Sequence, residues 1–156
     1  PMLYKQTIQF ALQGGIIDLT CGMTGSAIPV PQAVKQALDA GVPLERLTLS
    51  SDGNGSMPKF NENNELIGLT AAAPRYLYEE MLSIVKAGVL PFDKALQLIT
   101  CNVADALKLE DKGRIAVGKD ADLIVWNNDL TLNKVFARGR LMVDEGQAVV
   151  KGTFEN

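Results

Sequence analysis

The sequence contains no histidine in its 156 residues and only two cysteines. Imidazole and thiolate are the usual ligands of zinc in proteins, so the chain has few side chains with which to build a hydrolytic metal site alone. Cys21 and Cys101 lie far apart without a CxxC pattern, which argues against a zinc knuckle, a redox motif or a cysteine nucleophile. We expect two buried thiols in a reducing compartment.

Long apolar runs and blocks of like charge are also absent. No apolar stretch approaches the length of a membrane-spanning helix, and Pro1 to Gln6 do not resemble a signal peptide. The 15 basic and 18 acidic residues are interspersed, so no basic face for nucleic acid is expected. With 47% hydrophobic residues the composition is globular. We expect a cytoplasmic protein that binds neither nucleic acid nor a membrane.

In the first two thirds of the chain, helical and strand patterns alternate. Apolar residues at helical spacing, short β-branched runs, and glycines or prolines at their ends define the elements. The predicted order is a helix over 3–13, a strand over 16–20, a helix over 31–38, a strand over 47–51, a surface loop over 58–64, a helix over 76–85 and a helix over 91–99. Asn102 is expected to cap a short helix toward Leu107. This order describes two β/α units of a parallel sheet.

From Gly113 onward the pattern changes to short strands separated by turn residues. The predicted strands are 121–126, 134–137, 140–143 and 148–151. We therefore divide the chain into residues 1–110 and 111–156. A closed eight-stranded β/α barrel takes about 250 residues, so two β/α units would be only a part of one.

Asp52 is the strongest candidate for a functional residue. It follows the predicted strand Leu47–Ser51 at the start of the loop Asp52-Gly53-Asn54-Gly55-Ser56. Barrel enzymes place catalytic groups after the carboxyl ends of their strands. A tight turn has a similar sequence, with Asp52 as a cap and Asn54-Gly55 at the corner, and this interpretation stays open on the residues alone.

Two segments together resemble a known family. They are Ser50-Ser51-Asp52-Gly53-Asn54-Gly55-Ser56 and the Gly-x-Ile-x-x-Gly-x-x-Ala-Asp-Leu pattern over 113–123. Both are similar to the C-terminal part of amidohydrolase-superfamily enzymes, and the first, with residues 135–143, is similar to isoaspartyl (β-aspartyl) dipeptidases. The resemblance implies an α/β fold: the last two β/α units of a metal-dependent hydrolase (β/α)8 TIM barrel over 1–110, and strands of a small β-sandwich over 111–156.

The resemblance also implies roles for four residues. Asp52 would bind one metal of a binuclear zinc centre and carry a proton during hydrolysis of a dipeptide by metal-activated water. Ser56 would bind the α-carboxylate of the substrate, and Gly53 and Gly55 would permit positive φ angles and close approach of a ligand. The family's other metal ligands and its substrate-binding arginines have no counterpart in this chain. We therefore expect it to be inactive by itself, and to form a homo-oligomer or to associate with the missing N-terminal half.

Other interpretations remain open. The enzyme could be another amidohydrolase, dihydroorotase-like or deacetylase-like, or the chain could be a non-catalytic scaffold or oligomerisation module. Asp120 and Asp122 lack the spacing and further oxygen ligands of a calcium loop, so they are expected to lie in a turn before a strand. Tyr76 and Tyr78 are expected to be packing residues of their helix.

Overall fold

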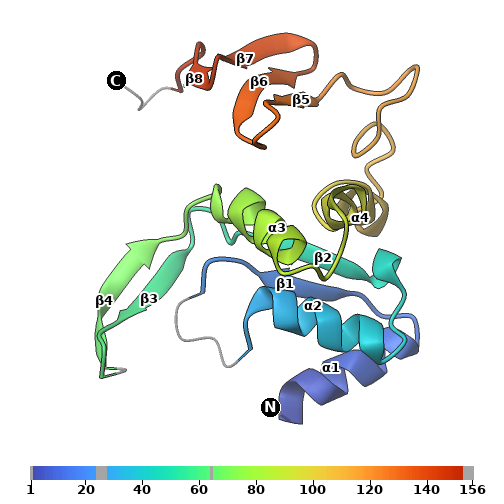
Figure 1. The fold of residues 1–156 in the computed structure, drawn as a ribbon, viewed down its shortest axis with the longest axis vertical. Coiled ribbons are helices and arrows are strands. Elements are labelled where there is room, and N and C mark those ends of the chain that lie inside the picture. The colour runs from blue at the N-terminus through green and yellow to red at the C-terminus, as the bar shows by residue number, and fades with distance from the viewer. Residues whose placement is uncertain (1, 24–27, 64, 153–156) are drawn as a thin grey trace. The chain divides into compact units, whose positions relative to one another are not determined.

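A computed structural model describes residues 2–23, 28–63 and 65–152 (Figure 1). The chain divides into two compact units, one ending at Leu107 and the other beginning at Lys108. We call them the N-terminal unit and the C-terminal unit. Among the described residues, no helix is both long and apolar enough to cross a bilayer.

The N-terminal unit mixes helices with two small sheets. Its elements are α1 (Met2–Leu12), β1 (Ile17–Thr20), α2 (Val30–Asp39), the 3-10 turn η1 (Leu44–Arg46), β2 (Leu47–Ser50), β3 (Ser56–Phe60), β4 (Leu66–Ala71), α3 (Tyr76–Lys86), α4 (Phe92–Gln97) and α5 (Cys101–Ala106). The helices predicted over 3–13, 31–38 and 76–85 correspond to α1, α2 and α3, and both strands of the β/α units are present.

β1 and β2 form a parallel pair, with Ile17 opposite Leu47 and Thr20 opposite Ser50. Ile17 and Leu47 are buried in the apolar core, which lies between this pair and the helices. Because side chains alternate along a strand, the polar residues between the core positions lie on the opposite face of the pair. The core residues are Ile8, Ala11, Ile17, Cys21, Val34, Ala37, Val42, Leu47, Leu49, Met81, Ile84, Ala95 and Leu98.

Asn102 does not cap α5, contrary to the prediction; Thr100 precedes the helix. The side chain of Asn102 is buried, and its amide nitrogen donates to the carbonyl oxygens of Leu44 and Leu47 at 2.8 and 2.9 Å. The amide of Leu49 also donates to the carbonyl of Leu98 at 3.0 Å. On the edge of β2 that faces away from β1, the carbonyl of Leu47 and the amide of Leu49 therefore have hydrogen-bonding partners, in Asn102 of α5 and in Leu98.

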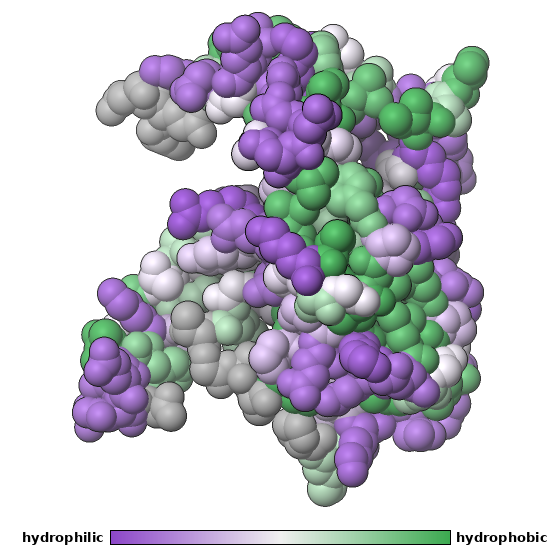
Figure 2. Space-filling view, viewed as in Figure 1, coloured by the Kyte–Doolittle hydropathy of each residue, from purple (hydrophilic) through white to green (hydrophobic). Residues whose placement is uncertain are grey.

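The segment predicted as a surface loop over 58–64 contains part of an antiparallel hairpin, formed by β3 and β4; Asn64 lies outside the described residues. Every residue of β4 is exposed, including Leu66, Ile67 and Leu69. Apolar and polar side chains therefore lie side by side on the projecting hairpin at the lower left of Figure 2. The strands were missed because neither shows the alternation that a one-sided core would impose.

The C-terminal unit is an antiparallel sheet in the order β5-β6-β7-β8. Its strands are β5 (Leu123–Trp126), β6 (Leu132–Ala137), β7 (Arg140–Asp144) and β8 (Gln147–Ala148). The three strands predicted between 121 and 143 match β5, β6 and β7, whereas the last is shorter and earlier than the predicted 148–151. None of the described residues of this unit is buried.

Candidate functional site

Asp52 lies in a tight turn at the carboxyl end of β2. The amide of Gly55 donates to the carbonyl of Asp52 at 2.7 Å, which closes a four-residue turn. Two further backbone hydrogen bonds join the turn to Ala72. The amide of Asn54 donates to the carbonyl of Ala72 at 3.0 Å, and the amide of Ala72 donates to the carbonyl of Gly55 at 2.9 Å. The backbone of residues 52–55 therefore forms the tight turn that the sequence had left open as one interpretation. The Asp52 carboxylate is exposed and takes no part in it.

The positive φ angles of this turn belong to Asp52 and Asn54, at 48° and 65°, and not to Gly53 and Gly55 as predicted. Aspartate and asparagine are the residues other than glycine that adopt this region most readily. Gly55 is required for a different reason: a Cβ there would lie 2.8 Å from the carbonyl oxygen of Asp52. Backbone strain of this kind is concentrated at functional sites, where neighbouring structure maintains it.

Asp18 joins β1 to the strand that carries Asp52. Its two carboxylate oxygens accept hydrogen bonds from the hydroxyls of Thr48 at 2.7 Å and Ser50 at 2.5 Å. All three residues lie on the face of the strand pair opposite the core, as the register requires. The ladder also continues past the strands, because the amide of Cys21 donates to the carbonyl of Ser50 at 2.7 Å. These bonds align the ends of β1 and β2, after which Gly22 and Asp52 follow.

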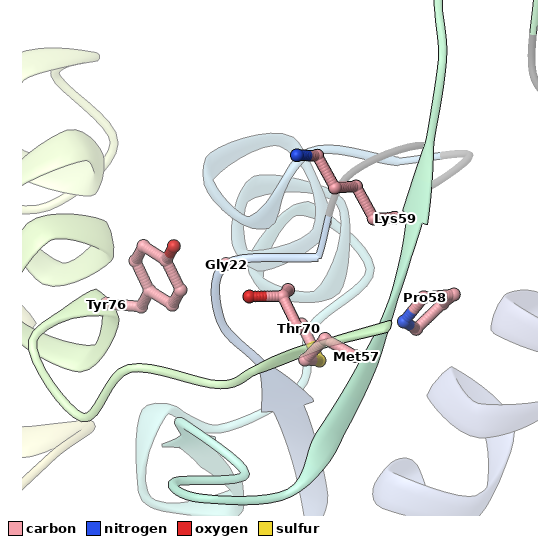
Figure 3. A pocket seen from close by; sticks show the side chains of 6 residues that line it. All are labelled: Gly22, Met57, Pro58, Lys59, Thr70 and Tyr76. Atoms are coloured by element: carbon pink, nitrogen blue, oxygen red, sulfur yellow. The ribbon is translucent and has the colours of Figure 1, made fainter. Parts of the chain in front are cut away.

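A cavity of about 250 Å³ lies beside these strand ends (Figure 3). Ser56, the first residue of β3, comes just before Met57, a lining residue of the cavity. The exposed hydroxyl of Ser56 has no protein partner among the described residues. Tyr76 also packs against the core, as the sequence predicted, but its ring forms one wall of the cavity. The cavity is lined by Gly22, Met57, Pro58, Lys59, Thr70 and Tyr76.

The two cysteines differ from each other in environment. Cys21 is fully buried, and burial, followed by the charges of Glu80 and Asp18, raises the pKa of its thiol to about 12. It is therefore protonated and unreactive at neutral pH. Cys101 is only partly buried, which corrects the expectation of two buried thiols, and both are free. Cys101 is the first residue of α5.

Asp120 and Asp122 both form ion pairs with Lys112. The Lys112 ammonium lies 2.7 Å from Asp120 and 2.5 Å from Asp122, and the amide of Arg138 donates to Asp122 at 2.7 Å. Hydrogen bonding to Lys112 lowers the pKa of both carboxyls. The same contacts raise the pKa of Lys112. Lys112 and Arg138 were not predicted as partners of the two aspartates, because both are distant from them along the chain.

The part of this chain that the structure describes does not by itself form a metal centre. Among the described residues, no three histidine, cysteine, aspartate or glutamate side chains gather where they could hold an ion. Asp52 offers one oxygen ligand, whereas a hydrolytic zinc usually takes three protein ligands. Asp18, Lys59, Thr70 and Tyr76 were not among the predicted site residues. The alternation of polar and apolar residues on β1 and β2 could have indicated that Asp18 lies on the polar face of the strand pair. No such pattern marks Lys59 and Thr70 on the hairpin.

Sequence comparison relates the chain to a hydrolase family. The model of the Amidohydrolase family matches residues 29–142. An imidazolonepropionase from Anaeromyxobacter sp. (strain K) is 34% identical over 112 residues, which are 72% of this chain and 22% of that protein. Adenine deaminase 1 from Carboxydothermus hydrogenoformans is 27% identical over 104 residues, 65% of this chain and 17% of that protein. The chain thus spans about a fifth of the length of these curated relatives.

Structure comparison places β-aspartyl dipeptidases among the neighbours. The enzyme from Fervidobacterium islandicum AW-1, in complex with a β-Asp-Leu dipeptide, superposes with a TM-score of 0.83 and 31% identity over 97% of this chain and 39% of its own. N-acetylglucosamine-6-phosphate deacetylase from Thermotoga maritima superposes with a TM-score of 0.63 at 19% identity, over 83% of this chain and 39% of its own, which shows a shared fold. The amidohydrolase resemblance and the α/β fold of TIM-barrel type are confirmed.

Proposed function

Because the chain belongs to the amidohydrolase family, we propose that the protein carrying it hydrolyses β-aspartyl dipeptides. The observation that favours this substrate is the likeness to the β-aspartyl dipeptidase in complex with β-Asp-Leu, which extends over 97% of the chain at 31% identity. The position of Asp52 agrees with it, since its exposed carboxylate, which has no partner among the described residues, lies where barrel enzymes carry out their chemistry.

Asp52 is proposed to be the proton carrier of the reaction. Its carboxylate would take a proton from the attacking water and deliver it to the amine that leaves. The turn that holds Asp52 is fixed to Ala72 by two backbone hydrogen bonds, and β2 is fixed to β1 by Asp18. A carboxylate held in this way needs little reorganisation when the proton moves.

Ser56 is proposed to bind the α-carboxylate of the dipeptide. Its hydroxyl is exposed at the start of β3, four residues after Asp52, and both residues are held by the same turn and hairpin. A hydroxyl that donates to a carboxylate forms a charge-assisted hydrogen bond, stronger than a neutral one. Gly53 and Gly55 carry no side chains, so Asn54 is the one residue between Asp52 and Ser56 that has a side chain.

The metal of this enzyme is proposed to be zinc. Amidohydrolases are generally metal-dependent, and a metal ion would activate water and polarise the scissile carbonyl. Asp52 would supply one ligand, and the others would come from residues outside this chain. The chain alone is therefore expected to be inactive. We further propose that it associates with the rest of a barrel, or with another copy, through the outer edge of β1.

A second candidate activity is that of the curated relatives. The imidazolonepropionase match covers 72% of this chain at 34% identity, which is a higher identity than that of the dipeptidase but over a smaller part of the chain. An imidazolonepropionase-like or adenine deaminase-like enzyme would share the fold and differ in the substrate that it accepts.

A substrate panel tests the proposal. The full-length protein, loaded with zinc, would be assayed with β-Asp-Leu, α-Asp-Leu, imidazolonepropionate and adenine. Turnover of β-Asp-Leu alone is expected. Asp52→Asn should reduce kcat by at least about a hundredfold, the lower range for loss of a general acid-base group. Ser56→Ala should lower kcat/KM by roughly tenfold or more with less effect on metal content. Turnover of another substrate in place of β-Asp-Leu would refute the proposal.

A further inference from the structure

The cavity lined by Met57 and Tyr76 is small. Its volume is about 250 Å³, below the roughly 300 to 1,000 Å³ of pockets that enclose a small molecule. It begins at Gly22, just beyond β1, and includes Met57, which follows Ser56 in β3. Because β1 pairs with β2, Gly22 and Asp52 both follow the same end of the strand pair, and a ligand bound at Asp52 would extend from that end.

The wall formed by Tyr76 depends on the absence of a side chain at position 22. A Cβ on Gly22 would lie 2.3 Å from Cδ2 of the Tyr76 ring, so the ring packs directly on the backbone. The φ of Gly22 is 72°, a conformation that side chains other than glycine rarely adopt. The shape of the cavity is thus set by two residues on separate elements, one after β1 and one at the start of α3.

Three polar groups lie around the cavity. Lys59 reaches from β3 over the backbone at Gly22, and the hydroxyl of Thr70, on β4, is directed toward the same space (Figure 3). Tyr76 lies on the opposite side, across from Lys59 and Thr70 (Figure 3). Within the described part of the chain, none of these three groups has a hydrogen-bonding partner. Among the described residues that line the cavity, Lys59 is the only charged one.

We propose that this cavity binds the side chain of the amino acid released from the dipeptide, and that Lys59 selects a side chain ending in a carboxylate. The inference rests on the proposed function. Met57, Pro58 and the Tyr76 ring offer apolar walls to the methylene groups of such a side chain. The Lys59 ammonium and the Thr70 hydroxyl would donate to its carboxylate. Glutamate matches this combination of an apolar stem and an anionic end.

The test compares a charged side chain with its neutral isostere. The kcat/KM values of the full-length enzyme would be measured for β-Asp-Glu, β-Asp-Gln and β-Asp-Leu, and binding of free glutamate and glutamine by calorimetry. We expect a preference for Glu over Gln of roughly tenfold, the lower end for one charge-assisted hydrogen bond at a solvent-accessible site. Lys59→Met should remove the preference, and Lys59→Arg should retain it. Lys5→Met, an equal charge change in α1, should leave it unaltered.

The outcomes separate the inference from the proposed function. Turnover of β-Asp-Leu with equal rates for Glu and Gln dipeptides would overturn the inference and leave the function standing. A Lys59-dependent preference for free glutamate without any dipeptide turnover would support the cavity and refute the function. If Lys59→Met lowered turnover of all three dipeptides by the same factor, Lys59 would bind the α-carboxylate that they share, and its assignment to the side chain would be wrong.

Discussion

The two units of the chain are stabilised in different ways. The N-terminal unit encloses a continuous apolar core between a parallel strand pair and its helices, and residues such as Leu98 and Met81 are fully buried in it. The C-terminal unit has four strands but no buried residue among those described, and the side chains of Ile115 and Val117 are 89% and 106% exposed. Apolar burial is the largest favourable contribution to folding. The N-terminal unit is therefore expected to be much the more stable.

The candidate site belongs to the better-packed unit. Asp52, Ser56 and the residues of the cavity all lie before Leu107, in the loops, hairpin and helix that follow the core strands β1 and β2. Catalytic groups require a rigid support, and loops at the ends of buried strands provide it. The C-terminal sheet contributes none of these residues, so changes in it should alter stability before they alter chemistry.

The largest effect is expected from a cavity in the core. Leu98→Ala should lower the free energy of unfolding of the N-terminal unit by about 2 to 5 kcal/mol, because it removes a fully buried side chain. Ile124→Ala in β5, where the side chain is 43% exposed, should cost less than about 1 kcal/mol.

Two probes distinguish the units in this measurement. All described helices lie in the N-terminal unit, so far-ultraviolet circular dichroism during urea unfolding reports on it. Trp126, the sole tryptophan, lies in β5 and its fluorescence reports on the C-terminal unit. If Leu98→Ala shifted both transitions equally, the units would unfold together and the contrast between them would be wrong.

A second prediction concerns the buried amide that joins α5 to β2. Asn102→Ala should destabilise the N-terminal unit by about 1 to 3 kcal/mol, because two buried carbonyl groups, those of Leu44 and Leu47, lose their donor. Asn128→Ala, in the exposed turn after β5, is the matched control and should have little effect. Equal effects of the two changes, measured by circular dichroism, would show that the buried amide does not stabilise the strand edge.

Asn102 illustrates which features of the fold can be predicted from sequence alone and which cannot. Elements with strong apolar periodicity, such as α2 and α3, were predicted because burial imposes that periodicity. Asn102 was predicted as a cap because local sequence shows only its neighbours, whereas its partners lie 55 and 58 positions earlier. The exposed hairpin β3–β4 was missed for the complementary reason: without a buried face, nothing constrains which of its residues are apolar.

The candidate site was predictable to a similar extent. Asp52 could be identified because a β-prone run ends at a carboxylate and a glycine-rich loop, a local pattern. Its positive φ could not, since the turn is set by hydrogen bonds to Ala72. Lys59 and Thr70 meet only because β3 pairs with β4, and Tyr76 joins them from α3. These three residues are brought together by tertiary structure, so no local sequence pattern predicts that they line one cavity.

A third prediction tests the connection between the strands. Asp18→Ala should cost about 1 kcal/mol, because the hydroxyls of Thr48 and Ser50 lose a common acceptor at a solvent-accessible position. Asp18→Asn keeps one acceptor oxygen and should recover part of this loss. Asp39→Ala, which removes an exposed carboxylate paired with Lys35 on α2, is the control and should cost roughly 0.5 kcal/mol or less. A cost for Asp18→Ala no larger than the control would mean that these hydrogen bonds do not align the strands.

The smallest effect is expected in the ion-pair cluster of the C-terminal unit, and it should depend on pH. Hydrogen bonds to Lys112 lower the pKa of Asp120 and Asp122, so their stabilising contribution is present above the ordinary carboxyl value of about 4 and is lost as pH falls through the lowered values. The pKa of Lys112 is raised by both aspartates, so its contribution is present below about 10.4 and is lost as pH rises through the raised value. Lys112→Met should therefore reduce the stability reported by Trp126 between these limits and flatten its decline in acid. Lys151→Met, an exposed position in the same unit, should leave the pH profile unchanged. If Lys112→Met also left it unchanged, ion pairs would not compensate for the absence of a buried core, and the sheet would depend on its backbone ladder alone.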